Sequence, residues 1–349
     1  MKDLKQTAFA LFVGAIGGAI FFVLNFPLAW MLGAMCIATV ASLRGRDVSV
    51  NETFRKIMTA ILGVMLGCGF STDTLAAMTR WSGGLALLLI SIVISMILVY
   101  LFYRRIGRLD PVTAYFSAAP GGINVMYEIG QERGGNGSVI ALIHASRILI
   151  LVMTVPMIFR FSGGFDSSAQ MAPLFGNFND LIGDGWLLLA AVLGYIGGRL
   201  CRLPAYHLMG PLAATAFVQM AGITDVAPPM ILVYAAQLVI GTAMGARFLG
   251  TRFSDIRNVI ALSFASTALM VGIAAAFAWA FADAIGVSGA GIVLAFSPGG
   301  LAEMSLVALA LGIDVAFVST MHVIRIALII AIVPPVYTAI EKFRRRSAE

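Results

Sequence analysis

One set of chemically capable residues occurs twice in this chain of 349 residues. Each set is a Pro-Gly-Gly step followed by a histidine and, three residues later, an arginine. The two copies are Pro120-Gly121-Gly122 with His144 and Arg147, and Pro298-Gly299-Gly300 with His322 and Arg325. The same offset in residue number separates every member of the second copy from its counterpart. Because the spacing is identical, the two sets look like the two halves of one site.

The arginines suit an anionic ligand. A guanidinium binds a carboxylate through two parallel hydrogen bonds, so Arg147 and Arg325 could converge on one small organic anion. An arginine near the centre of a bilayer is costly to bury and is expected to face a polar cavity or a partner. The alternative is structural, with each arginine holding backbone carbonyls that a broken helix leaves free. The residues alone leave both interpretations open.

The other members of each set extend the same hypothesis. His144 and His322 lie one turn before the arginines and could bind a ligand, relay a proton or simply form internal hydrogen bonds. A Pro-Gly-Gly step breaks a helix, and a helix restarting after it would aim free N–H groups at an anion. Asn124 and Glu303 follow the two steps and make them chemically unlike. Glu303 could pair with an arginine or carry a coupling proton or cation.

The sequence therefore predicts a substrate-binding site and no catalytic one. The predicted binding residues are Pro120, Gly121, Gly122, Asn124, His144, Arg147, Pro298, Gly299, Gly300, Glu303, His322 and Arg325. The three cysteines are scattered and give no metal-ligand spacing. We expect no enzyme, no metal and no cofactor beyond a coupling ion, H⁺ or Na⁺.

The composition is that of a membrane protein that crosses the bilayer many times. The chain is 60% hydrophobic and 11% charged, whereas a soluble domain is about a quarter charged. Its net charge of +6 does not indicate a nucleic-acid partner, because the basic tail from Lys342 to Arg346 is better explained as an anchor at the cytoplasmic membrane surface. The expected partners are the lipid bilayer and a small anionic solute.

Apolar segments divide the chain into two similar halves. Full spans are expected near 7–24, 28–43, 57–71, 82–103 and 138–159, and again near 184–200, 206–222, 230–248, 259–282 and 315–336. Broken segments are expected at 111–131 and 288–312. The predicted domains are a first repeat over 1–161, an extracytoplasmic linker over 162–180 and a second repeat over 181–349. In the first helix of each repeat, Gly14, Gly17 and Gly18 are matched with Gly194, Gly197 and Gly198.

The distribution of Lys and Arg predicts how the halves are oriented. If 111–131 crossed the membrane, the basic residues of the second half would lie outside, against the positive-inside rule. If 111–131 is instead a re-entrant hairpin, these residues return to the cytoplasm and only Arg80 and Arg160 remain outside. The expected fold is thus all-α, with two inverted repeats of about five transmembrane helices and one re-entrant hairpin each. Both termini are expected in the cytoplasm, and the protein in the inner membrane.

The motifs also carry a resemblance to a known family. Through Ser117-Ala-Ala-Pro-Gly-Gly-Ile-Asn124, Ser297-Pro-Gly-Gly-Leu-Ala-Glu303 and the two His-x-x-Arg helices, the chain resembles the membrane AbrB-like proteins over essentially its whole length. That resemblance implies a duplicated membrane domain, and it brings two labels, ammonia monooxygenase and regulator of gene expression. A looser analogy links the architecture to sodium-coupled glutamate and citrate symporters.

Inverted repeats with irregular backbone near the midplane are typical of secondary transporters. The favoured function is therefore secondary transport of a small organic anion. A membrane regulator or sensor without transport is the alternative. An ammonia monooxygenase is disfavoured, because no copper or iron ligand set is evident beyond His144 and His322. The label of gene regulator has no direct support in the sequence either, because no soluble helix-turn-helix or basic DNA-reading segment is present. The substrate, the coupling ion, the direction of transport and a homodimer stay open.

Overall fold

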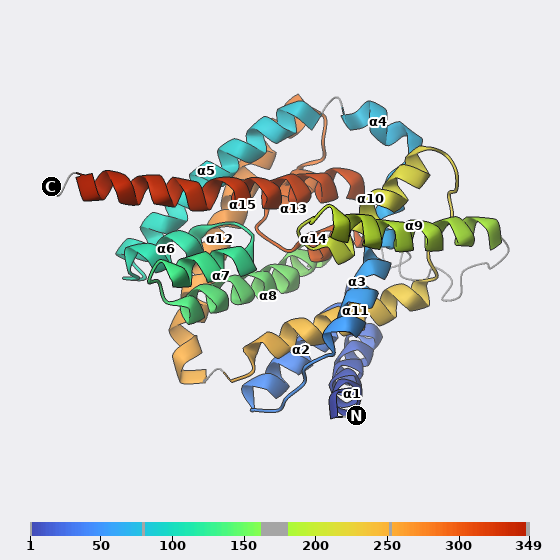
Figure 1. Cartoon of the computed structure of the whole chain (residues 1–349), viewed down its shortest axis with the longest axis horizontal. Helices are drawn as coiled ribbons and strands as arrows, with labels where there is room; N and C mark the ends of the chain where they lie inside the picture. Colours follow the sequence, from blue (N-terminus) through green and yellow to red (C-terminus); the bar gives the residue numbers. More distant parts are fainter. Residues whose placement is uncertain (1, 79–80, 162–180, 251–252, 347–349) are drawn as a thin grey trace. The chain divides into compact units, whose positions relative to one another are not determined.

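A computed structural model describes residues 2–78, 81–161, 181–250 and 253–346, and all regular structure in these ranges is helical (Figure 1). The helices in chain order are α1 (Lys2–Val23), α2 (Ala29–Leu43), α3 (Glu52–Gly67), α4 (Thr72–Met78), α5 (Trp81–Arg105), α6 (Pro111–Ala118), α7 (Ile123–Glu132), α8 (Gly137–Phe161), α9 (Leu181–Leu200), α10 (Tyr206–Met220), α11 (Met230–Gly245), the 3₁₀ helix η2 (Ala246–Phe248), α12 (Phe253–Ile285), α13 (Gly289–Phe296), α14 (Leu301–Ala310) and α15 (Val315–Arg346).

Six of these helices are long and apolar enough to cross a membrane, which agrees with the predicted all-helical membrane protein. They cover Leu4–Val23, Trp81–Arg105, Gly137–Phe161, Met230–Phe248, Arg257–Ile285 and Val315–Phe343. A seventh span would join α3 and α4, which are bent by 74°. The sequence predicted ten full spans. Several of the others are short: α2 and α10 have 15 residues each, roughly 23 Å at ~1.5 Å per residue, which is less than the ~30 Å hydrocarbon core.

Corresponding helices of the two halves begin and end at equivalent positions of the duplicated sequence. Three pairs of helices both begin and end at positions related by the offset of the two Pro-Gly-Gly steps: α3 and α11, α6 and α13, and α7 and α14. The same offset relates the first residues of α8 and α15. The first two helices of each half follow an offset that is shorter by a single position. It relates the last residues of α1 and α9, and the first residues of α2 and α10. The internal duplication read from the motifs therefore extends to the helix boundaries.

The expected glycine matching in α1 and α9 is wrong, and close packing explains why. A Cβ on Gly17 would overlap the backbone of Gly33, and a Cβ on Gly194 would overlap the backbone of Gly210. The structural counterpart of Gly17 is thus Gly194, at the shorter offset, and not Gly197. A Cβ on Gly197 would meet no atom within 4 Å. Gly197 is therefore not required by a close crossing of two helices.

The chain forms two compact units, and each draws on both halves of the sequence. Unit 1 consists of Met1–Ser82, Val152–Ser254 and Leu301–Ser319, and unit 2 consists of Gly83–Leu151, Asp255–Gly300 and Thr320–Glu349. The long helices α8 and α15 contribute to both units. These units are a different division of the chain from the predicted sequence repeats, and the predicted linker 162–180 lies outside the described residues.

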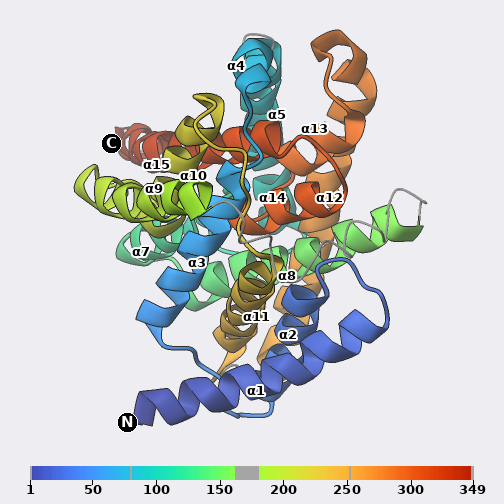
Figure 2. The ribbon, with the colours of Figure 1, turned by 90° about the vertical axis from the view of Figure 1, so that its right-hand side faces the viewer.

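Unit 1 is held by helices that cross at glycines. In Figure 2, α1 lies below α2 and α11, and it contacts both. Gly241 and Gly245 of α11 meet the backbone of α2, while Gly63 and Gly67 of α3 meet the backbone of α10. Both crossings pair a helix from one half of the sequence with a helix from the other. Glycine at these positions lets two backbones approach within the reach of van der Waals packing.

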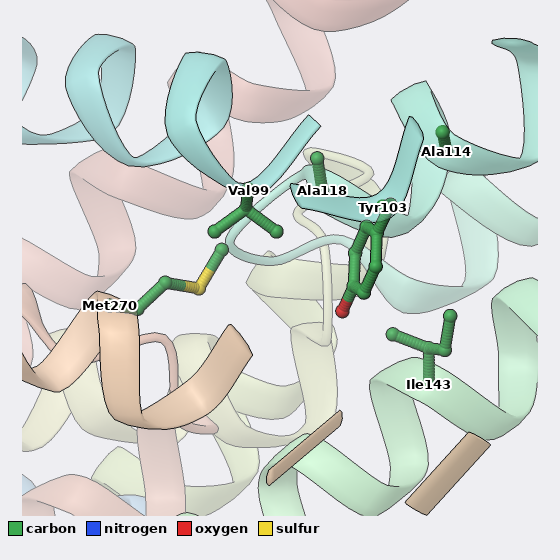
Figure 3. Packing of buried hydrophobic residues seen from close by; sticks show 6 residues of the cluster. All are labelled: Val99, Tyr103, Ala114, Ala118, Ile143 and Met270. Atoms are coloured by element: carbon green, nitrogen blue, oxygen red, sulfur yellow. The ribbon is translucent and has the colours of Figure 1, made fainter. Parts of the chain in front are cut away.

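Unit 2 has a core that holds the first broken segment. Figure 3 shows Val99 and Tyr103 of α5 beside Ala118 of α6, Ile143 of α8 and Met270 of α12. The hydroxyl groups of Tyr103 and Ser266 are 2.7 Å apart and hydrogen-bonded within this apolar surrounding.

A second cluster in unit 2 adds α7 and α15 to these helices through buried apolar residues that include Phe116, Met126 and Ile329. The helices that carry the two histidines and arginines therefore pack around the α6–α7 segment.

Candidate functional site

Both Pro-Gly-Gly steps interrupt the helix, as the sequence predicted. α6 ends at Ala118 and α7 begins at Ile123; α13 ends at Phe296 and α14 begins at Leu301. Gly122 precedes α7 with φ 67°, a left-handed conformation that glycine adopts without strain. The helix before each break starts at an equivalent cap. Asp110 accepts a hydrogen bond from the N–H of Thr113, and Ser288 accepts one from the N–H of Gly291.

The two arginines donate hydrogen bonds to backbone carbonyls that lose their helical partners where α6 and α13 end. Arg147 is 1% exposed and donates from Nη1 to the carbonyl of Ala119 at 2.7 Å and from Nη2 to that of Ser117 at 2.5 Å. Arg325 is fully buried and its Nη1 donates to the carbonyls of Ser297 and Ala295, which are the equivalent residues. A cation is favourable at the C-terminus of a helix, where unpaired carbonyls and the negative end of the dipole meet.

The histidines bind one turn earlier on the same helices. His144 Nε2 lies 3.0 Å from the carbonyl oxygen of Phe116, and His322 Nε2 lies 3.0 Å from that of Leu294. A carbonyl oxygen only accepts, so Nε2 carries the proton in both side chains. Each histidine and arginine together clamp the end of the helix that leads into a Pro-Gly-Gly step.

The two clamps differ in how fully the guanidinium is used. Arg325 Nη2 donates both to the carbonyl of Gly299 at 2.8 Å and to Nδ1 of His322 at 2.7 Å. His322 therefore accepts at Nδ1 and donates at Nε2, which makes it a neutral imidazole of fixed tautomer. Among the described residues, no hydrogen bond joins Arg147 to His144. In the same ranges Arg147 uses only one N–H on each Nη, whereas Arg325 uses both.

Several polar atoms around the clamps are buried with no hydrogen-bond partner among the described residues. They are Nε of Arg147, Nε of Arg325 and the hydroxyl groups of Ser117, Ser146 and Ser297. Buried polar atoms normally find a partner, so such a group marks strain or a place for water or a ligand. Sequence reasoning missed the serines as site residues, although Ser117 and Ser297 begin the two quoted motifs and Ser146 directly precedes Arg147.

The clamps hold positive charge that no acidic side chain of the described residues offsets by direct contact. In the described parts of the chain, neither arginine forms an ion pair with a carboxylate. The charge of Arg147 acts on Arg325, so both belong to one electrostatic environment within unit 2. Neutral carbonyls provide partial compensation only. A site of this kind attracts an anion.

Glu303 and Asn124 do not join the clamps. Glu303 lies on α14 in unit 1, whereas the other predicted residues lie in unit 2. It is 9% exposed, and the cation that acts on it is Arg247. Arg247 was not among the predicted site residues, and only the fold brings it into range of Glu303. Asn124 is exposed in the first turn of α7.

No group of three or more His, Cys, Asp or Glu side chains in the described residues could hold a metal ion. Cys36, Cys68 and Cys201 are free thiols. The residues that the structure does bring together are arginine, histidine and serine side chains with backbone carbonyls, and guanidinium groups are suited to binding an anion.

Known proteins resemble this chain along almost its whole length. It is 25% identical over 359 aligned residues to the uncharacterized protein YhjN of Bacillus subtilis strain 168, which covers 96% of this chain and 93% of that protein. It is 25% identical over 338 residues to a protein of Escherichia coli strain K12 that is named as a candidate regulator, AbrB, covering 94% of each. Residues 30–341 match the family model described as transition state regulatory protein AbrB. Since that match includes both Pro-Gly-Gly steps and both His-x-x-Arg helices, the chain belongs to the AbrB family.

Proposed function

We propose that this protein is a secondary active transporter of a small organic anion. The observation that carries the proposal is the pair of buried guanidiniums, Arg147 and Arg325, bound only by neutral groups in the described structure. Burying an unpaired charge is costly in an apolar surrounding. An anion that enters the site would offset both charges and gain from the unpaired N–H and hydroxyl groups nearby.

Arg147 is the principal anion ligand in this proposal. Its Nε–H and one N–H on each Nη have no partner within the described ranges, so it can present two donors to a carboxylate while holding its helix end. Arg325 has both Nη groups committed to carbonyls and His322. Its contribution is to fix the second Pro-Gly-Gly step and to add long-range positive charge.

The proposed architecture is a pair of inverted repeats, with 111–131 and the equivalent 288–312 as re-entrant hairpins. The charge distribution supports this arrangement, because it places most Lys and Arg residues on one side of the membrane. The helices of the two halves begin and end at equivalent positions, and short helices flank each break, both of which agree with this arrangement. Under this proposal the protein lies in the inner membrane with both termini in the cytoplasm, as in transporters that alternate between two accessible states.

Glu303 is the proposed site of the coupling ion. It is a buried carboxylate on α14, and the positive charge of Arg247 acts on it. Glu303 belongs to unit 1, whereas the histidines and arginines of the two clamps belong to unit 2. A buried carboxylate can bind H⁺ directly or serve as one ligand of Na⁺. Replacing Glu303 with Gln is expected to abolish stimulation of uptake by an H⁺ or Na⁺ gradient while anion binding persists.

The alternative is a membrane regulator that binds a ligand and does not transport it, a possibility that the name of the Escherichia coli relative favours. One experiment separates the two. Purified protein is screened for thermal stabilisation by carboxylates, amino acids and sulfonates, and the most stabilising anion is then offered in labelled form to proteoliposomes. Accumulation driven by an ion gradient supports transport. Stabilisation without flux under any gradient favours the regulator and would overturn the transport proposal.

A further inference from the structure

A groove of about 470 Å³ runs along unit 2 between α5 and α15, with the start of α6 at one end. Its walls are almost entirely apolar and include Leu89, Val93 and Ile97 of α5 and Ile332 and Val336 of α15. Several of these side chains are largely exposed, with Val93 at 56% and Ile97 at 54%. In a membrane such a groove faces lipid. None of the histidines and arginines of the two clamps is among its lining residues.

The length of the groove matches one leaflet of a bilayer. On α5 the lining residues extend from Leu89 to Tyr100, roughly 16 Å at ~1.5 Å per residue. Half of the ~30 Å hydrocarbon core is about 15 Å. An extended acyl chain that begins at the membrane surface would therefore reach the far end of the groove near the midplane.

One end of the groove has the character of a membrane interface. Tyr115 lies between the other two tyrosines of the lining, with ring centroids 6.4 Å from Tyr100 and 5.0 Å from Tyr337. The Tyr115 hydroxyl donates to the carbonyl of Val333 at 2.8 Å. Tyrosine is enriched at the level of lipid headgroups because its ring is apolar and its hydroxyl polar. The tyrosine end is therefore the headgroup end.

A cation lies one helical turn beyond this end. Arg104 follows Tyr100 by four residues on α5, so both occupy the same helix face. Arg104 is exposed and gives one hydrogen bond in the described structure, from Nη1 to the carbonyl of Leu109 at 2.5 Å, which leaves its other N–H groups for an anion. Arg133 differs, because Glu341 neutralises it at 2.6 Å. The apolar lining, the tyrosines and the exposed Arg104 therefore follow one another along the groove in the same order as the acyl chain, the interfacial region and the phosphate of a phospholipid.

We infer that this groove binds an anionic phospholipid, with an acyl chain between α5 and α15 and the phosphate at Arg104. The lipid belongs to the leaflet on the basic side of the protein. Its acyl chain fills apolar space that α5 and α15 leave uncovered. A lipid that bridges α5 and α15 holds together helices that carry the core of unit 2 and one of its arginine clamps.

Matched substitutions on α5 test the inference. Arg104→Gln removes the proposed phosphate contact, and Arg105→Gln removes the same charge from the side of the helix that faces away from the groove. Ile97→Trp fills the groove, and Leu98→Trp places the same bulk on the opposite face. Each protein is delipidated in detergent and titrated with phosphatidylglycerol or phosphatidylcholine, while native mass spectrometry counts bound lipids and reports the oligomeric state.

Wild type and both control variants are expected to bind phosphatidylglycerol more tightly than phosphatidylcholine. Arg104→Gln should weaken phosphatidylglycerol about fivefold, the equivalent of ~1 kcal/mol for one basic residue at the membrane surface, and Ile97→Trp should weaken both lipids. Equal losses in Arg104→Gln and Arg105→Gln would contradict a phosphate site and indicate general surface attraction. If Ile97→Trp separates a dimer and leaves lipid binding unchanged, the groove belongs to a second copy of the chain and the inference is wrong.

Discussion

Arg325 and His322 are joined by a hydrogen bond of 2.7 Å from Nη2 to Nδ1, and the corresponding pair in the first half, Arg147 and His144, shows no such bond within the described structure. Arg325 Nη2 also donates to the carbonyl of Gly299, a bond that Arg147 does not repeat in the described residues. The remaining contacts of the two clamps match position for position along the duplication. The second copy thus makes the contacts of the first and adds two more. The difference commits Arg325 to structure and leaves Arg147 available for a ligand.

Replacing Arg325 with Ala is expected to destabilise the protein more than replacing Arg147 with Ala. Arg325 donates to three carbonyls and to His322, and each of these buried groups would lose a charged donor. The carbonyl of Ser297 would keep its bond from the N–H of Gly299. The expected cost is about 3 kcal/mol or more. Thermal unfolding of the two purified variants in detergent measures it. Equal melting temperatures for the two variants would contradict the asymmetry of the clamps.

Replacing each histidine with Phe gives a second comparison. His322→Phe removes the donor to Leu294 and the acceptor for Arg325, whereas His144→Phe removes the bond to Phe116 only. His322→Phe is expected to cost about 1–3 kcal/mol more, because it also leaves a buried guanidinium N–H unpaired. The same unfolding assay applies. A larger loss in His144→Phe would show that His322 does not anchor Arg325.

Two glycines in α9 test the helix crossing in unit 1. Gly194→Ala would drive a methyl group into the backbone of Gly210, so clear destabilisation and weak expression are expected. Gly197→Ala meets no atom within 4 Å and should be neutral or stabilising by up to about 1 kcal/mol, since Ala favours a helix over Gly. Equal behaviour of the two variants would support the glycine matching that the sequence alone suggested.

The local features of the chain could be read from the sequence, and the long-range ones could not. Both helix breaks lie at the Pro-Gly-Gly steps because proline and glycine act on their own turn of backbone. The burial of Arg147 and Arg325 also followed from their place in apolar segments. The sequence also offered backbone carbonyls as alternative partners of the arginines, and these are the partners that the structure shows. It could not decide between carbonyls and an anion, because carbonyls become available only where a helix ends.

Three further details depended on packing. Gly194, and not Gly197, meets the backbone of the next helix, because the first two helices of each half follow a shorter offset than the later ones. Only the crossing itself shows which glycine is needed. The cation that acts on Glu303 is Arg247, which shares unit 1 with it, whereas Arg325 belongs to unit 2. The unpartnered serines around the clamps became visible only once their surroundings in the described structure were known.

The proposed orientation in the membrane can be tested by labelling introduced cysteines. In a chain whose three native cysteines are replaced by Ser, one new cysteine is placed at Ser167 and another at Ser347. An impermeant thiol reagent added to intact cells should react only at position 167, since the linker is expected outside and the C-terminus in the cytoplasm. Labelling of both positions, or of neither before lysis and both after it, would rule out the proposed topology.

The most direct test of the anion-transport proposal is gradient-driven uptake by the Arg147→Ala variant in proteoliposomes. The substrate is the anion that most stabilises the wild type, and thermal unfolding without substrate serves as the folding control. Uptake and binding should be lost while folding is kept, with a binding loss of about 2–5 kcal/mol, the usual scale for removing one partner of a buried charge pair. Arg147→Lys should recover only part of the activity, because an ammonium cannot form the two parallel bonds of a guanidinium. Full transport activity in Arg147→Ala would contradict the proposal.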